Sequence, residues 1–143
     1  MNIPQIVFFA PIIRHNLIAL AVITALSALW IIWLALRVIR LRWKTATGIG
    51  DGGHPDLERA IRVHANAVEI APLTLLLLLM AALTTARSLE VIVLGILFLL
   101  GRVLHGWGLS RSAGPSVGRA SGIILNFLVI AILSGQLIAL LFR

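Results

Sequence analysis

The sequence predicts an all-α integral membrane protein, a bundle of four antiparallel helices in a single domain over residues 1–143. Of its 143 residues, 60% are hydrophobic and only 12% are charged, whereas an average soluble domain is about half apolar and a quarter charged. Two stretches, 16–36 and 121–142, carry no charge, and each reaches the roughly 20 residues that a spanning helix needs. A soluble single domain could not bury this much apolar surface, so a membrane environment is expected.

Four spans are expected, at about 15–40, 56–86, 89–109 and 119–142. The first follows Arg14, but its apolar run exceeds a signal-peptide core and no small-residue cleavage site ends it, so we expect it to be retained. The middle spans are less apolar, because only 17 uncharged residues separate Glu69 from Arg87 and only 11 separate Glu90 from Arg102. Both must therefore draw polar residues into the membrane.

The connections between the spans favour an antiparallel arrangement. The glycine-rich segment 48–53 ends any helix, and Pro55 suits the first turn of the next one. The segment TTARSLE is short enough for a helical hairpin, and SRSAGPSVGRASG joins the third span to the fourth. Trp30, Trp33, Trp43 and Trp107 are interpreted as residues of the interfacial aromatic belt.

The distribution of basic residues predicts the orientation. Of the twelve Lys and Arg residues, only Arg14, Arg87 and Arg143 fall on the side of the termini. The other nine lie in or beside the connections after spans one and three: Arg37, Arg40, Arg42, Lys44, Arg59, Arg62, Arg102, Arg111 and Arg119. By the positive-inside tendency, both termini are expected outside and this basic side in the cytoplasm.

The second span begins with a one-sided polar stripe. At 100° per residue, five polar side chains fall within about 100° of one another, while His64 points elsewhere. They are Glu58, Arg59, Arg62, Asn66 and Glu69. A buried ion-pair network that holds helices or subunits in register would explain the stripe, and so would a hydrophilic ligand pocket that opens to the cytoplasm. Both charge signs together with an amide suit a zwitterionic ligand.

Several functions are disfavoured by what the sequence lacks. There is no cysteine, so any sulfur chemistry must come from a ligand. No two histidines share ligand spacing, and no metal site is expected. The net charge is +7, and the basic residues that produce it lie between apolar segments. Anionic lipid headgroups are therefore a more plausible partner than nucleic acid, and no nucleic-acid binding is expected.

Three segments carry a family resemblance: GDGGHPDLERAIRVHANAVEIAPL, GRVLHGWGLSRS and the later GRASG. Together they resemble the bacterial branch of the MAPEG family, the membrane-associated proteins in eicosanoid and glutathione metabolism, and are similar to microsomal glutathione transferases. The resemblance covers nearly the whole chain. It implies a homotrimer of four-helix subunits in the bacterial inner membrane, with glutathione as a cosubstrate bound between neighbouring subunits near the cytoplasmic face.

The resemblance also implies roles for individual residues. Arg62, Asn66 and Glu69 would hold the tripeptide, with Arg59 and Glu58 in support. Arg102 and His105 match the family's G-R-x-x-H on the third helix and belong to the expected glutathione site. Arg119 is similar to the arginine that stabilises the glutathione thiolate and is the expected catalytic residue.

The expected activity is that of a glutathione-dependent transferase or peroxidase acting on lipophilic electrophiles that arrive from the membrane lipids. One departure favours an alternative, a lipid- or glutathione-binding member without catalysis. Where many relatives have a tyrosine after the glutamate, this chain has Ile70, and it contains no tyrosine at all. A transporter or channel subunit is disfavoured, because the charges cluster at one face instead of crossing the membrane.

Overall fold

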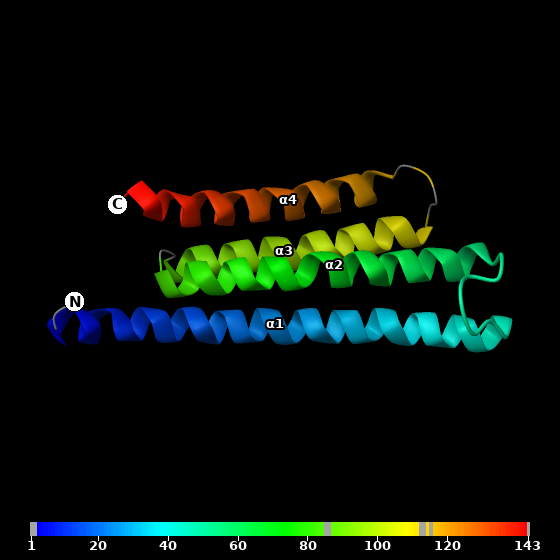
Figure 1. The fold of residues 1–143 in the computed structure, drawn as a ribbon, viewed down its shortest axis with the longest axis horizontal. Coiled ribbons are helices and arrows are strands. Elements are labelled where there is room, and N and C mark those ends of the chain that lie inside the picture. The colour runs from blue at the N-terminus through cyan, green and yellow to red at the C-terminus, as the bar shows by residue number, and fades with distance from the viewer. Residues whose placement is uncertain (1–2, 85–86, 112–113, 115, 143) are drawn as a thin grey trace.

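The computed structural model describes residues 3–84, 87–111, 114 and 116–142 (Figure 1). Four α-helices occupy almost all of this part of the chain, which contains no β-strand. They are α1 (Ile3–Thr45), α2 (Pro55–Thr84), α3 (Ser88–Arg111) and α4 (Val117–Ile138), and a short 3-10 helix, η1 (Ala139–Phe142), follows α4. The prediction of an all-α protein with four long apolar helices is therefore confirmed.

Successive helices run in opposite directions, so both ends of the chain lie at one end of the bundle (Figure 1). The connections α1–α2 and α3–α4 lie at the other end. Helices α2 and α3 are central: each contacts the other three helices, whereas α1 and α4 make no contact with each other in the described residues. Helices α2 and α3 thus separate α1 from α4, so that α1, α2 and α3 pack together on one side of the bundle and α2, α3 and α4 on the other.

All four helices contain segments long and apolar enough to cross a membrane: Pro11–Thr45, Pro55–Thr84, Ser88–Arg111 and Val117–Phe142. Large apolar side chains point outward from each of them, for example Leu29, Leu76, Leu100 and Phe127, which are all exposed. Lipid rather than water can solvate such a surface. The first segment would measure about 50 Å against a hydrocarbon core of roughly 30 Å, so its basic end extends past the membrane interior.

The interior consists of two apolar clusters. The larger one includes Leu78, Phe98, Val129 and Leu133, which are almost completely buried. The second, nearer the connections α1–α2 and α3–α4, contains Leu34, Val63, Ala67 and Leu109. These clusters fix the spacing of the helices on which the polar residues are mounted.

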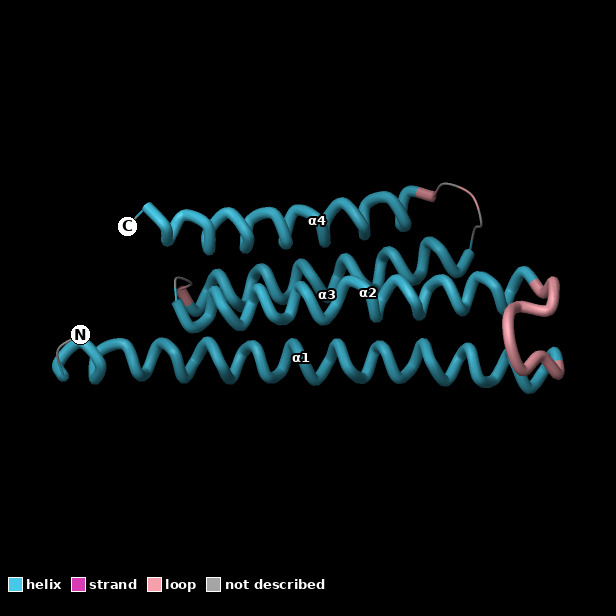
Figure 2. Tube along the Cα trace, viewed as in Figure 1, coloured by secondary structure: helices cyan, strands magenta, loops and turns pink. Residues whose placement is uncertain are grey.

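The connection α1–α2 is a compact loop (Figure 2). One arginine holds its backbone. The Nη1 atom of Arg42 donates to the carbonyl oxygens of Thr47, Gly48 and Gly50 at 3.3, 2.9 and 3.0 Å. Gly50 has a φ of 71° and Gly53 a φ of 76°, a region that glycine enters without strain. The loop can therefore reverse direction and start α2 at Pro55.

Glycines bring α3 and α4 into close contact. A β-carbon at Gly122 would lie 2.4 Å from the backbone nitrogen of His105, and one at Gly108 would lie 2.3 Å from the backbone nitrogen of Arg119. Neither position can carry a side chain without moving a helix. Small residues allow helix backbones to approach closely in membranes, and here the approach sets His105 against the first turn of α4.

Adding one methyl group at this contact should separate the two helices. We expect Gly122→Ala to lower the free energy of unfolding by about 1–3 kcal/mol, because the new β-carbon overlaps backbone atoms. Thermal unfolding in detergent, followed by circular dichroism, measures the effect. Gly135→Ala on the same helix is the matched control, since no described atom outside the neighbouring backbone of α4 lies within 4 Å of its β-carbon position. Equal stability of the two variants would contradict the close contact.

Candidate functional site

A polar cavity of about 390 Å³ lies between α2, α3 and α4. Six of the side chains that line it are polar: Glu58, Arg59, Arg62, Asn66, His105 and Arg119. Leu109 and Ile123 complete its wall. The cavity lies in the half of the bundle near the α1–α2 and α3–α4 connections, because its residues come from the start of α2, the end of α3 and the start of α4.

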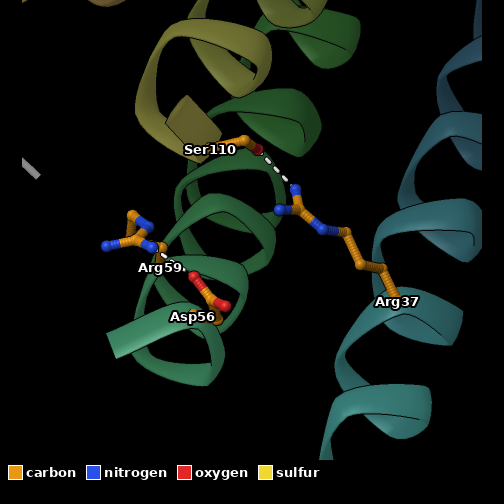
Figure 3. Close-up of polar contacts among 4 residues, drawn as sticks. All are labelled: Arg37, Asp56, Arg59 and Ser110. Atoms are coloured by element: carbon orange, nitrogen blue, oxygen red, sulfur yellow. Dashed lines mark hydrogen bonds and ion pairs between the residues drawn. The ribbon is translucent and has the colours of Figure 1, made fainter. Parts of the chain in front are cut away.

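The first turns of α2 supply one wall of the cavity. Asp56 and Glu58 lie in the first turn, where carboxylates interact favourably with the helix dipole. Arg59 is paired with Asp56 one turn before it (Figure 3). Arg62 and Glu58 are exposed and Asn66 is half-buried, so the stripe borders the cavity and continues onto the outer surface of the chain. His64 does not line the cavity.

Glu69 continues the stripe by one turn beyond Asn66. Its side chain is exposed on the surface of the single chain and does not line the cavity. The position lies inside the apolar segment Pro55–Thr84, where an unpaired carboxylate facing lipid is strongly unfavourable. The surface that carries Glu69 therefore needs a polar cover that the single chain does not provide in its described residues.

The opposite wall joins α3 to the start of α4. His105 is buried, and its Nδ1 atom lies 3.1 Å from the carbonyl oxygen of Arg119. The hydroxyl of Ser116 caps α4 by accepting from the backbone N–H of Arg119 at 3.3 Å. Arg119 thus adds its guanidinium at a helix N-terminus, where the backbone dipole is also positive. The cavity has a cationic end suited to an anionic atom.

Arg102 lies behind the cavity instead of lining it. Only 4% of its surface is exposed, and its Nε donates to Asn126 Oδ1 at 2.9 Å. Its Nη1 donates to both oxygens of Asn66, to Oδ1 at 2.9 Å and to the backbone carbonyl at 3.2 Å. Arg102 therefore joins α2, α3 and α4, and it fixes the amide of Asn66 at the edge of the cavity.

Asn126 also belongs to this network, although the sequence did not single it out. The side chain is fully buried, and its Nδ2 donates to the carbonyl of Gly122 at 2.8 Å, which leaves Oδ1 to accept from Arg102. The two amides in the uncharged stretch 121–142, at Asn126 and Gln136, were the available signal, because polar groups inside a membrane need partners. At the same end of the bundle, Arg37 of α1 donates to the hydroxyl of Ser110 on α3 (Figure 3).

The cavity thus combines three guanidinium groups, one carboxylate, one imidazole and one amide. Guanidinium groups bind carboxylates through two parallel hydrogen bonds, and a carboxylate accepts from an ammonium group. The amide can both donate and accept. This set defines a site for a small, mostly anionic or zwitterionic molecule, placed within a transmembrane helical bundle.

The sequence of this membrane protein matches the model of a known family. The chain belongs to the MAPEG family, whose model matches residues 20–139. The matched region includes all the residues that line the polar cavity.

Relatives with similar sequences occur in bacteria and in animals. The chain is 39% identical to the inner membrane protein YecN of Escherichia coli K12 over 88 residues, 62% of this chain and 67% of that protein. It is 33% identical to human microsomal glutathione S-transferase 2 over 121 residues, 83% and 79% of the two chains. It is 31% identical to protein sll1147 of Synechocystis over 125 residues, 86% and 88% of the two chains. These matches support a glutathione-related function at the level of the family and an integral membrane protein.

Removal of the Asn126 amide should destabilise the bundle. We expect Asn126→Leu to lower the free energy of unfolding by about 1–3 kcal/mol, because it leaves Nε of the buried Arg102 without an acceptor. Chemical unfolding in detergent micelles measures this loss, with Ser121→Ala at an exposed position of α4 as the control. Unchanged stability in Asn126→Leu would show that the three-helix link through Arg102 contributes little.

Proposed function

We propose that this protein is a glutathione-dependent transferase or peroxidase that activates the glutathione thiolate for attack on lipophilic electrophiles. The observation that carries the proposal is the polar cavity, in which Arg59, Arg62 and Arg119 meet Glu58 and Asn66 inside a membrane bundle. Glutathione carries two carboxylates, an ammonium group, two peptide links and a thiol. Each of these groups has a chemically suitable partner among the polar residues of this end of the bundle.

The binding roles follow from the chemistry of the side chains. Arg62 and Arg59 would bind the glutathione carboxylates, and Glu58 and Glu69 would accept from its ammonium group. Asn66, held by Arg102, would pair with a peptide link through its donor and its acceptor. His105 supports the wall through its contact with Arg119. Arg102 would act as a positioning residue for Asn66.

Arg119 would be the residue that activates sulfur. A free thiol has a pKa of about 8.5 and is mostly protonated at neutral pH, while a neighbouring cation lowers this pKa. Each unit of lowering corresponds to about 1.4 kcal/mol, so a lowering of about two units makes the thiolate the major species. Arg119 and the N-terminus of α4 together supply the positive potential, and no protein base is required.

Both proposed reactions, transfer and peroxide reduction, would begin with attack by the glutathione thiolate. In transfer, the sulfur lone pair forms a bond to an electrophilic carbon of the lipophilic substrate, and the leaving group departs with the electron pair of the broken bond. In peroxide reduction, the thiolate attacks the terminal oxygen of a hydroperoxide and the O–O bond breaks. Glutathione becomes a sulfenic acid, and the alkoxide leaves as an alcohol after it takes a proton from water. A second glutathione then yields the disulfide and water. In both cases Arg119 would stabilise the thiolate before attack.

The assembly that best fits the exposed polar surface of α2 would be a homotrimer, with the glutathione site between neighbouring subunits. The exposed Glu69 and Arg62 leave polar groups on the outside of one chain at membrane depth, and a neighbouring subunit with bound glutathione would cover them. We further propose that residues 1–143 form one domain in a bacterial inner membrane. Both termini would lie outside and the cavity would open to the cytoplasm, as the nine basic residues on its side favour.

A non-catalytic binding protein of the same family is the second candidate. Ile70 occupies the place after Glu69, and the chain has no tyrosine, so no phenol can assist the thiol. Such a protein would keep the cavity and bind glutathione or a lipid without lowering the thiol pKa. The two candidates therefore differ in the ionisation state of the bound ligand.

Replacement of Arg119 separates the candidates. Glutathione added to the purified enzyme at neutral pH should give an ultraviolet thiolate band, and we expect Arg119→Ala to abolish it while binding is largely kept. Arg119→Lys should restore part of the band, because it keeps the charge. Arg111→Ala is the matched control, since Arg111 stacks on Trp107 and does not line the cavity. A wild-type protein that binds glutathione without a thiolate band would instead be the non-catalytic member.

The subunit number is accessible to native mass spectrometry of the detergent-solubilised protein. We expect a mass of three chains, and we expect Glu69→Leu to change the stability of this assembly, because Glu69 would face the neighbouring subunit. Ile124→Leu, at an exposed apolar position of α4, serves as the control. A stable monomer that still binds glutathione would contradict the shared site.

A further inference from the structure

The last two turns of α1 carry a cluster of exposed cations. Arg40 and Lys44 are both exposed, and Trp43 between them is 84% exposed. At 100° per residue, the three side chains fall within about 100° of one another around the helix. This end of α1 projects beyond the ends of α3 and α4 (Figure 1). Arg40, Trp43 and Lys44 thus form an open surface, the basic cluster of α1.

The two charges of the basic cluster are not neutralised by the described part of the chain. The neighbouring arginines have partners: Arg37 donates to Ser110 on α3, and Arg42 holds the α1–α2 loop. Arg40 and Lys44, by contrast, make neither a hydrogen bond nor an ion pair with any described residue. Two like charges four residues apart on a helix repel each other. An anion from outside the chain would therefore stabilise this end of α1.

The two cations are also not used to cap the helix. Lysine and arginine near a helix C-terminus often donate to its last carbonyl oxygens, but here other donors have taken that place. The carbonyl of Leu41 accepts from the hydroxyl of Thr45 at 3.0 Å, and the carbonyl of Arg42 accepts from the backbone N–H of Thr47 at 3.1 Å. The donors of the basic cluster are therefore available to a ligand.

The length of α1 places the basic cluster at the depth of the lipid headgroups. The uncharged stretch 16–36 spans about 31 Å as a helix, close to the roughly 30 Å of a hydrocarbon core. Arg40 follows Leu36 by about 6 Å along the helix, and the headgroup layer is roughly 5–8 Å thick on each side. Helical side chains lean toward the N-terminus, which for α1 lies across the membrane, so Lys44 leans back toward the same layer.

The surfaces on either side of the basic cluster suit the two ends of a phospholipid. Toward the membrane centre, Ile32 and Leu36 lie on the same side of α1 and are 54 and 56% exposed. Toward the loop, Trp43 lines a cavity of about 550 Å³, whose wall also includes Arg42 and Thr47. Acyl chains would lie against the two apolar side chains, and a polar headgroup would reach the cavity.

We propose that the basic cluster of α1 binds an anionic phospholipid of the leaflet that it faces, with the lipid phosphate between Arg40 and Lys44. The guanidinium can donate two parallel hydrogen bonds to the phosphate, and the ammonium group adds a compact charge. The choline of a zwitterionic lipid would be repelled by the nearby Arg42, whereas the hydroxyl groups of phosphatidylglycerol would not. The site is independent of the proposed glutathione site, because none of the three cluster residues lines the polar cavity.

The binding test is native mass spectrometry of the full-length protein in detergent, titrated with dioleoyl phosphatidylglycerol and, separately, with dioleoyl phosphatidylcholine. We expect phosphatidylglycerol to bind more tightly. Arg40→Gln/Lys44→Gln should weaken its binding by about tenfold or more, because each basic residue at the membrane surface adds to the attraction of an anionic lipid. Binding of phosphatidylcholine should be unchanged. Equal affinity of the wild-type protein for the two lipids would overturn the proposal.

A second double variant tests the location at constant net charge. Arg14→Gln/Arg87→Gln removes two exposed cations at the end of the bundle where the termini lie, and it should leave the tight binding of phosphatidylglycerol intact. Equal losses in the two double variants would show that net charge alone attracts the lipid, and this would overturn the assignment. The glutathione thiolate band should persist in Arg40→Gln/Lys44→Gln, so failure of this site is distinguishable from failure of the proposed function.

A soluble phosphate is another source of the same anionic group. Inorganic phosphate, added at constant ionic strength, should not displace phosphatidylglycerol, because it lacks the acyl chains that would contact Ile32 and Leu36. Displacement of the lipid by inorganic phosphate would show that the basic cluster binds a soluble anion, and the lipid assignment would be wrong.

Discussion

The buried guanidinium of Arg102 is the interaction on which the rest of the structure depends. Its hydrogen bonds to Asn66 and Asn126 join α2, α3 and α4, and such a charge is tolerated in a membrane bundle only when it is well solvated by protein groups. The glycines of α3 and α4 allow the approach that these bonds require: a β-carbon at Gly101 would overlap the amide of Asn126. The same residue thus separates the polar cavity from an apolar cavity between α1, α2 and α3, and it contributes to the surroundings of both.

Much of the architecture could be predicted from the sequence, because spanning helices follow from uncharged runs of sufficient length. The one-sided stripe of α2 was also visible, since Arg59, Arg62 and Asn66 share a helical face. The apolar cavity could not be predicted, because its lining residues look the same as those that face lipid. Trp30 illustrates the difficulty: it was interpreted as a belt residue, yet it lines this cavity. The subunit number stays a prediction, since one chain shows only the uncovered Glu69.

The position of the polar cavity bears on the choice among functions. The larger apolar cluster, with Leu78, Phe98 and Leu133, fills the bundle between this cavity and the end where the chain termini lie. A continuous polar path, as a transporter would need, is not present in the described residues. A site at one end of the bundle, next to the lipid, suits a protein that brings a hydrophilic thiol to a lipophilic molecule. In the proposed function, thiolate chemistry would depend on Arg119, because Ile70 leaves no phenol for that task.

The most direct test of this account is the number of protons released when glutathione binds to the wild-type protein at neutral pH. Calorimetric titrations in buffers of different ionisation enthalpy give this number without any mutation. If the cavity stabilises the thiolate, about one proton should leave per glutathione bound, because the free thiol is mostly protonated at this pH. Binding without proton release, or no binding heat at all, would contradict the claim that this site activates sulfur.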